Sequence, residues 1–495
     1  MTANIYKTPI SQRYKWLVGI ITILASFLSI FIFNRFGMLS GYMLLILPFA
    51  IAYILISYNY LVTNIYILLF FSFFGVAFGR YILRDAIPWG IFFDFLLVYG
   101  YSIVLLKGVT RKVEWAKILD APLLVVIIWL FYCLSTVANP ERCEFDGWFT
   151  AFRLQLYMIL SIPLFCLLLD FKVLKIMLVL WAVFSIILSL KGFVQENIWL
   201  DPIDRAFLVG NTFHMVMGKL RVFSFLSDAG QFGVQQAHAT IFGAIMFLIT
   251  KNRKLRILFL IMAAVGLYGM FASGTRGAIF VIFGGALVFC FLIRRTKLFI
   301  ISVILAGSFF CFMSYTNIGN GTYAIFRMRT AFKPEQDDSY LARKLNQAVL
   351  KAYLKPRPFG GGLGAMQHGP KESVLASTPY DSGFILIWGD TGIVGLSLYI
   401  GMIVIFLIKG SWLVWFRIKN EWLRGVLIAL LAGIFGISVA NYGNPVMLQY
   451  PTNVLYFMSV AIIYSASRMD KSLQKQEEDD EVQPQPTSTK MTLYR

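Results

Sequence analysis

Charged side chains are scarce in this sequence, and their scarcity decides the class of protein. Only 14% of the 495 residues are charged and 58% are hydrophobic, whereas a soluble domain carries about one quarter charged residues. Water would not dissolve a folded surface of this composition, so a soluble enzyme is excluded. The same apolar content excludes a disordered scaffold. We therefore expect an all-α polytopic membrane protein.

Histidine and cysteine are also rare, with three and five residues respectively. A zinc site needs these ligands in close, regular spacing. Here they are scattered, so we do not expect a zinc site. Five cysteines in so long a chain do not make a secreted disulfide framework. Cys133 and Cys143 both fall near the expected outer face, and the sequence leaves open whether they are oxidised.

Long apolar runs fill most of the chain. A membrane-crossing helix needs about 20 mostly apolar residues, and the sequence contains about fourteen such segments, with twelve or thirteen as alternatives. No cleavable signal peptide is expected, because the run at 20–33 is too long for one and no small-residue cleavage site follows. We expect spans near 16–34, 38–57, 61–79, 88–106, 119–138, 152–169, 173–191, 230–250, 257–273, 277–293, 298–315, 382–407, 423–440 and 452–467.

Basic residues orient these spans. The sequence holds 44 Lys and Arg against 25 Asp and Glu, and short basic loops of membrane proteins stay in the cytoplasm. Placing Lys7, Arg13 and Lys15 in the cytoplasm puts most other short basic loops there too, including those at 107–117 and 251–256. We therefore expect both termini to be cytoplasmic and the number of spans to be even.

Two expected outer connections are long, and connections of more than about 15 residues are usually functional or disordered. The second is too apolar for a plain linker. Its basic excess suggests an anionic partner on the outer face, with a solvated basic surface as the open alternative. The expected order is N-terminal transmembrane helices at 1–191, a first long outer loop at 192–229, transmembrane helices at 230–315, a large structured outer (periplasmic) loop at 316–381, C-terminal transmembrane helices at 382–467 and a disordered cytoplasmic tail at 468–495.

An amphipathic helix is expected over Tyr340–Lys355 in the large loop, because apolar residues recur there at spacings of three and four. Arg343, Gln347 and Lys351 follow one another along a second stripe. Such a helix could lie among lipid headgroups and offer Arg343 to a lipid diphosphate. Alternatively, it could cap the bundle with its basic residues facing water.

Two more arginines, Arg221 and Arg276, fall at expected outer ends of spans beside small or polar residues. A guanidinium binds phosphate oxygens with two parallel hydrogen bonds, although snorkelling to the headgroups would favour the same positions. A glycine-rich run follows the amphipathic helix, and its N–H groups could approach an anion closely. The glycines of this run are Gly360, Gly361, Gly362 and Gly364.

The end of the large loop carries a familiar pattern. Residues 380–395 read Tyr-Asp-Ser-Gly-Phe-Ile-Leu-Ile-Trp-Gly-Asp-Thr-Gly-Ile-Val-Gly. This segment resembles the hallmark of the O-antigen ligase and O-antigen polymerase family of bacterial membrane glycosyltransferases, and residues 273–277 are similar to the family's Ser-x-x-Arg-Gly turn. Asp381 stands where the ligases carry histidine. The positions that fit the later part of the hallmark are Asp390, Gly392 and Gly395.

The resemblance covers roughly 205–400 and implies a metal-independent glycosyl transfer, with no metal and no other cofactor, on the outer face of the bacterial inner membrane. It implies a glycan donor on undecaprenyl diphosphate, a glycan acceptor, and membrane lipids, a chain-length regulator and a flippase as partners, with no nucleic acid. Arg221, Arg276 and Arg343 are then the candidates for stabilising the leaving diphosphate. Asp381 is the candidate base, with His368 in reserve; Tyr380, Gln347, Lys351 and the glycine run are candidate substrate contacts.

Four functions remain open, and one of them is a non-catalytic subunit of polysaccharide assembly, for which the arginines would be dispensable. The acid at position 381 favours a polymerase of lipid-linked repeat units over a ligase. A ligase would differ only in its acceptor, which would be lipid A core or protein instead of a growing glycan. A flippase or other transporter has a similar number of spans, but such folds usually contain two related halves with polar groups near the midplane. Here no internal repeat is evident and the notable polarity lies at one face. The sugars, the linkage and the oligomeric state stay undetermined.

Overall fold

The computed structural model describes residues 38–83, 89–109, 113–216, 218–293, 296–321, 323–332 and 338–482. In these residues nearly all of the regular structure is helical, as the apolar composition predicts. The strand pair, β1 (Met215–Val216) and β2 (Lys219–Leu220), is antiparallel and lies in the first long loop.

The helices follow the order of the apolar runs. Up to the first long loop they are α2 (Met38–Asn59), α3 (Thr63–Phe78) with the π-helical turn η1 (Gly79–Leu83), α4 (Trp89–Val109), η2 (Trp115–Asp120), α5 (Leu123–Ser135), η3 (Thr136–Ala138), α6 (Phe145–Leu168) and α7 (Phe171–Asn197). That loop holds α8 (Pro202–Gly210) and η4 (Thr212–His214), and after it come α9 (Ala229–Ile249), α10 (Arg253–Ala272), η5 (Arg276–Ala278), α11 (Ile279–Leu292) and α12 (Thr296–Tyr315). The large loop and the C-terminal part contain α13 (Tyr323–Arg329), η6 (Thr330–Phe332), α14 (Asp338–Leu354), α15 (Ala365–His368), α16 (Val374–Ser377), α17 (Gly383–Phe416), α18 (Glu421–Ala440), η8 (Val446–Leu448) and α19 (Thr452–Val482).

A helix occupies every expected span except the first, 16–34, which lies outside the described residues. Of the helices in the described part, eight are long and apolar enough to cross a membrane. Shorter apolar helices cover Leu47–Asn59, Leu123–Ala138 and Arg276–Leu292. The chain is therefore an all-α, multi-pass membrane protein, while the total of about fourteen spans and the side of each terminus stay predictions.

Small residues let the central helices pack closely. Gly243 of α9 lies directly against the Phe259 carbonyl and Ala263 of α10, and Gly436 of α18 lies against the Val281 carbonyl of α11. A side chain at either glycine would collide with backbone. Lipid supplies no hydrophobic drive for helix association, so close packing at small residues is how such helices hold together.

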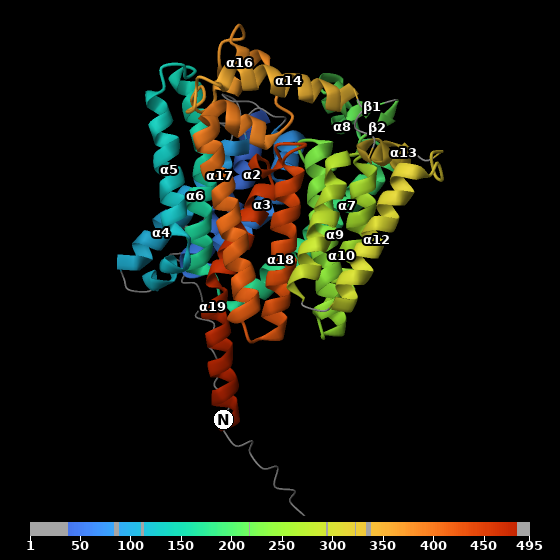
Figure 1. Cartoon of the computed structure of the whole chain (residues 1–495). Coiled ribbons are helices and arrows are strands. Elements are labelled where there is room, and N and C mark those ends of the chain that lie inside the picture. Colours follow the sequence, from blue (N-terminus) through green and yellow to red (C-terminus); the bar gives the residue numbers. More distant parts are fainter. Residues whose placement is uncertain are drawn as a thin grey trace, which may run out of the picture.

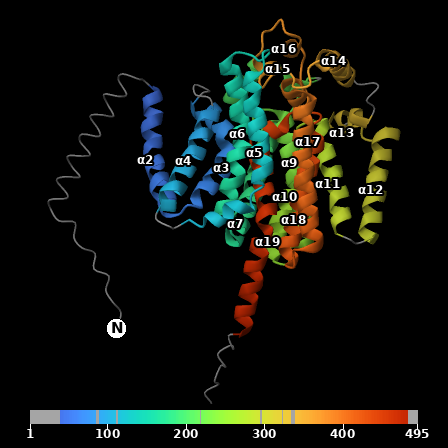
Figure 2. The ribbon, with the colours of Figure 1, turned by 60° about the vertical axis from the view of Figure 1, so that its left-hand side comes forward.

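The two ends of the bundle differ (Figures 1 and 2). Helix α14 lies across one end, where α8, β1, β2, α13 and α16 are also found, and α19 extends beyond the opposite end. The amphipathic helix expected at 340–355 is thus confirmed as helix α14. The disordered tail expected from 468 is wrong up to Val482, because α19 continues that far. The tail's Glu, Lys and Gln residues are good helix formers and extend a helix already nucleated by packing; residues 483–495 lie outside the described part.

Helix α17 begins at the hallmark segment and is kinked within it. Gly392 has φ 66° and ψ −170°, a conformation that L side chains rarely adopt. The kink brings the Gly392 backbone against Pro358 and Gly360, so that a Cβ at position 392 would overlap their backbone atoms. Two glycine segments far apart in the sequence thereby dock on one another, which fixes the large loop to α17.

Candidate active site

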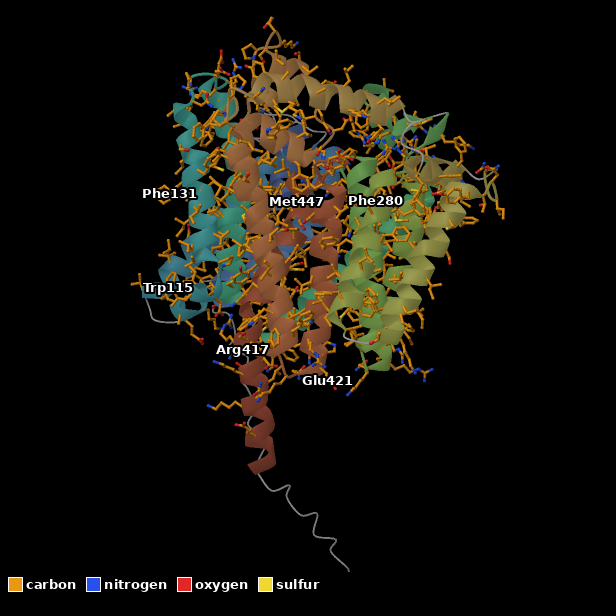
Figure 3. All side chains as sticks on the ribbon, viewed as in Figure 1. Trp115, Phe131, Phe280, Arg417, Glu421 and Met447 are labelled. Atoms are coloured by element: carbon orange, nitrogen blue, oxygen red, sulfur yellow. The ribbon has the colours of Figure 1, made fainter. Side chains whose placement is uncertain are left out.

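A cavity of about 890 Å³ opens under the N-terminal part of α14. Its wall comes from both long loops, from the turn between α10 and α11, from the start of α17 and from the segment after α18. Phe280, labelled in Figure 3, belongs to the wall and lies in the half of the bundle nearer α14. Every segment that the sequence singled out for outer arginines therefore contributes to one hollow.

Arg221 reaches the cavity from the strand pair of the first long loop. Its backbone N–H donates to the His214 carbonyl at 2.8 Å, which closes the loop just before it. Its guanidinium donates through Nη2 to Thr275 Oγ1 at 3.2 Å and through Nε to the Ser273 carbonyl at 3.4 Å. Arg221 is thus joined to the turn that carries Arg276, although 54 residues separate it from Thr275.

Arg276 follows a tight turn between α10 and α11. Gly274 takes φ 59° there, and Ser273 Oγ accepts the Thr275 N–H at 3.1 Å. A glycine with positive φ and a short polar side chain that accepts a nearby N–H are both common in tight turns. Here they let the chain reverse between α10 and α11 without a long loop. The turn places Arg276 on the cavity wall, where its Nη1 donates to Thr330 Oγ1 at 3.3 Å.

Arg327 is a fourth wall arginine, and the sequence reasoning did not single it out. It lies on α13, and its Nε donates to the Gly274 carbonyl at 2.8 Å. Arg329, two residues later, is turned away and donates to the Ile318 carbonyl at 2.8 Å. No sequence pattern distinguishes the two; only the direction of each side chain on this short helix does.

Arg343 and Asp381 meet at the cavity wall. Arg343 Nε lies 3.2 Å from Asp381 Oδ2, and the side chains are 30% and 54% exposed. Asp381 is held at the mouth because Ser382 caps α17 and the Gly383 N–H donates to the Asn441 carbonyl at 2.8 Å. Tyr380 joins the same wall. The arginine predicted for a diphosphate and the carboxylate predicted as base are therefore direct neighbours.

The charge of the cavity is strongly positive. Four arginines line it, against the carboxylates of Asp228 and Asp381. One carboxylate oxygen of Asp228 already has a partner, because Oδ1 accepts the Gln231 N–H at 2.9 Å and caps α9. Tyr442 and Asn444 add neutral hydrogen-bonding groups to the same wall. Clustered guanidiniums with few acids suit a multiply charged anion such as a diphosphate.

The remaining predicted substrate residues divide into two groups. Gln347 donates through Nε2 to the hydroxyl of Tyr442 at 3.3 Å and so lies beside the wall. Lys351 is exposed further along α14, and His368 is exposed at the end of α15, beside Gly147 of α6. Within the described part, neither residue is among those that line this cavity.

The glycine run also lies apart from the cavity. The Gly364 and Met366 N–H groups donate to the two carboxylate oxygens of Asp390 at 3.0 and 2.9 Å, and the Gly361 N–H donates to the Gly389 carbonyl at 3.0 Å. These N–H groups therefore bind α17 instead of pointing to an open site. Cys133 and Cys143 are both buried as free thiols in the structure.

Comparison with known families agrees with the resemblance in the sequence. Residues 259–400 match the family model described as O-Antigen ligase, a stretch that includes Arg276, Arg327, Arg343 and Asp381. Arg221 lies before it. A search of curated proteins gave no match. The family indicates a glycosyltransferase-like enzyme that acts on lipid-linked glycans. Residues 259–400 of this multi-pass membrane protein thus match the O-antigen ligase family, and this stretch supplies most of the basic wall of the cavity.

Proposed function

We propose that the protein is a polymerase of lipid-linked polysaccharide repeat units. It transfers a glycan from undecaprenyl diphosphate to a sugar hydroxyl of the acceptor, on the outer face of the bacterial inner membrane. The observation that carries the proposal is the cavity wall, where Arg221, Arg276, Arg327 and Arg343 surround one space next to Asp381. An arginine cluster beside a carboxylate is what a reaction with a diphosphate leaving group and a hydroxyl nucleophile requires.

In the proposed reaction the acceptor oxygen bonds to the anomeric carbon of the donor glycan. The bond from that carbon to the diphosphate oxygen breaks, and the electron pair leaves with the lipid diphosphate. The arginines stabilise the charge that develops on this oxygen, since fixed donors need no reorganisation during the reaction. Asp381 orients the acceptor hydroxyl and takes its proton.

Arg343 connects the two parts of this chemistry. It faces the same space as the other arginines while it is paired with Asp381 at 3.2 Å. A diphosphate that draws Arg343 toward itself would weaken this pair and release Asp381 toward the acceptor hydroxyl. Tyr380, Tyr442 and Asn444 on the same wall offer hydroxyl and amide groups of the kind that bind sugars.

The choice of polymerase over ligase rests on residue 381. An aspartate stands there where the ligases carry histidine, and the structure puts that aspartate on the wall of the basic cavity. A ligase reaction uses the same donor chemistry but ends on lipid A core or protein. The nature of the acceptor, and therefore of the product, separates the two functions.

The test uses full-length protein reconstituted in vesicles with undecaprenyl-diphosphate-linked repeat units. Wild type should convert single repeats into a ladder of longer glycans and release lipid diphosphate. Replacing Arg221, Arg276 or Arg343 singly by lysine should slow polymerisation about 100-fold, because lysine cannot make the forked contact. Arg205 is exposed and lies outside the cavity wall, so Arg205→Lys is the matched control and should polymerise as wild type does.

Three outcomes would count against the proposal. Full activity in the lysine variants would mean that the arginines only anchor the chain at the headgroups. Transfer of one glycan to lipid A core or protein, with no ladder, would assign a ligase. Movement of the lipid-linked repeat across the vesicle membrane without any glycan elongation would assign a transporter.

A further inference from the structure

A second cavity, of about 820 Å³, lies at the opposite end of the bundle, the end from which α19 extends. Its wall is formed by the start of α7, the turn between α9 and α10, the turn between α17 and α18, and one side of α19. Glu421, labelled in Figure 3, lies at this end. We propose that this cavity binds the headgroup of an anionic phospholipid, a function separate from glycan transfer.

The cavity sits level with the ends of several candidate spans. Phe171 begins one span, Ile249 ends a second and Glu421 begins a third, and all three residues line the cavity. The ends of membrane spans are where lipid headgroups lie. A ligand in this position therefore meets the protein at headgroup depth.

Thr250 gives direct evidence of an unfilled polar contact. Thr250 is one of the residues that line the cavity, it is only 3% exposed, and among the described residues its buried Oγ1 has no hydrogen-bond partner. A buried hydroxyl without a partner is destabilising. A phosphate or glycerol oxygen in the cavity would satisfy this hydroxyl.

The charges of the wall favour an anion. Lys175, Lys251 and Lys419 line the cavity, against Glu421 and Glu478. Lys251 and Glu421 form an exposed pair at 3.5 Å, which is worth little in water. Lys175 and Lys419 then stand against Glu478 and leave an excess of positive charge on the wall. Helix α10 also begins there, with the positive end of its helix dipole behind the Asn252 cap.

An apolar wall beside these charges favours a lipid over a free anion. Lys175 Nζ lies 4.4 Å from the ring centre of Phe171 and 5.7 Å from that of Trp422, and both rings line the cavity together with Ile249 and Leu255. A phospholipid brings a phosphate for the lysines and glycerol and acyl carbons for the rings. A free phosphate would leave these apolar side chains exposed to water.

The experiment measures retained lipid on the full-length protein by native mass spectrometry. Protein from vesicles of equimolar phosphatidylglycerol and phosphatidylcholine should keep phosphatidylglycerol in preference to phosphatidylcholine. The double variant Lys175→Gln/Lys419→Gln should bind phosphatidylglycerol about 30-fold more weakly, since each juxtamembrane lysine contributes about a fivefold gain in affinity. Lys172→Gln, one turn away on α7 and outside the cavity wall, should bind as wild type does.

Thr250→Val separates binding from folding because it keeps the side-chain shape and removes only the hydroxyl. Loss of phosphatidylglycerol preference in this variant, with an unchanged melting temperature in lipid-free detergent, supports the proposal. Equal retention in wild type, Thr250→Val and the lysine variant would overturn it. Displacement of the lipid by millimolar inorganic phosphate would also overturn it, because free phosphate would then be the ligand. None of these readouts requires glycan transfer, so the result is independent of the proposed function.

Discussion

At the scale of single residues, side-chain direction separates Arg327 from Arg329. Both lie on α13, but Arg327 lines the basic cavity and donates to the Gly274 carbonyl, while Arg329 is 4% exposed and directed to the Ile318 carbonyl. Arg327 also contacts the turn that carries Arg276. If the cavity binds a diphosphate, Arg327 takes part in holding it.

We predict that Arg327→Lys lowers the rate of glycan transfer at least about tenfold, because a charge-assisted hydrogen bond is worth about 1.5–3 kcal/mol. Initial rates with purified protein and lipid-linked repeat units measure this. Arg329→Lys is the comparison, and its effect should be on the melting temperature, since its side chain is buried. Equal losses of rate in both variants at equal stability would place Arg327 outside the reaction.

At the scale of elements, one contact fixes the large loop to α17. Gly360 and Gly392 both have positive φ, and their backbones are too close to admit a Cβ on either. Asp390 strengthens the contact by accepting the N–H groups of Gly364 and Met366. The contact therefore ties the glycine run of the large loop to the interior of α17, while the Ser382 cap and the Gly383–Asn441 bond fix its start.

We predict that Gly392→Ala destabilises the protein by at least about 2–3 kcal/mol, through an unfavourable φ and through overlap with the Pro358 carbonyl. Thermal unfolding in detergent should show a lower midpoint. Gly401→Ala, on the same helix with open space around its α carbon, serves as the control and should be neutral or slightly stabilising. A Gly392→Ala protein as stable as wild type would mean that the kink is not required.

The first long loop contains a buried histidine that should make this element sensitive to acid. His214 is fully buried among the rings of Phe207, Phe213 and Phe223. Burial, and then the positive charges of Arg221 and Arg80, lower the pKa of His214 from 6.5 to about 4. The folded protein thus keeps this side chain neutral.

The sign of the pH effect follows from the lowered pKa. Above about pH 6.5 neither the folded nor the unfolded protein protonates His214, and the residue has no effect on stability. Between about pH 6.5 and 4 the unfolded chain binds the proton and the folded protein does not, so folding weakens by up to about 3 kcal/mol. His214→Phe should remove this loss, seen as a smaller fall of melting temperature on acidification. An unchanged acid profile in this variant would exclude His214 as its source.

At the scale of the whole molecule, a buried ionic cluster joins the N-terminal helices to the first long loop. Arg80 of η1 contacts Asp204 of α8 at 3.3 Å, and Asp204 also accepts from Lys191 at 3.0 Å and from Gln195 at 2.8 Å. Arg80 also donates to the Leu226 carbonyl at 2.7 Å. The cluster thereby holds the chain shortly after Arg221, on one side of the proposed active site.

We predict that Asp204→Asn destabilises the protein by about 3–5 kcal/mol, since it leaves Arg80 buried without its counter-charge. The exposed pair of Lys251 and Glu421 is the contrast, and Glu421→Gln should cost less than about 1 kcal/mol. Thermal unfolding in detergent measures both. Similar midpoints for the two variants would show that the cluster contributes no more than a surface pair.

Much of the molecule follows from the sequence by itself. Apolar runs long enough to cross a membrane give the all-α class and the positions of the long apolar helices in the described residues, but not those of the loop helices α8, α13, α15 and α16. The spacing of apolar residues at 340–355 gives α14. The hallmark at 380–395 and the turn at 273–277 point to the O-antigen ligase family, which the family comparison supports. Apolar runs, helical spacing and short motifs each depend on residues that are close in sequence, so a local sequence pattern is enough to predict them.

Tertiary structure alone decides which side chains share the cavity. Arg221, Arg276, Arg327 and Arg343 come from four separate elements, and their convergence depends on how the loops fold over the helix ends. The composition of the glycine run suggested an anion site, but the Gly364 N–H donates to Asp390 and the Gly361 N–H donates to the Gly389 carbonyl of α17. Hydrogen-bond partners distant in sequence leave no trace in a local pattern, so the family can be seen in the sequence and the shape of the site cannot.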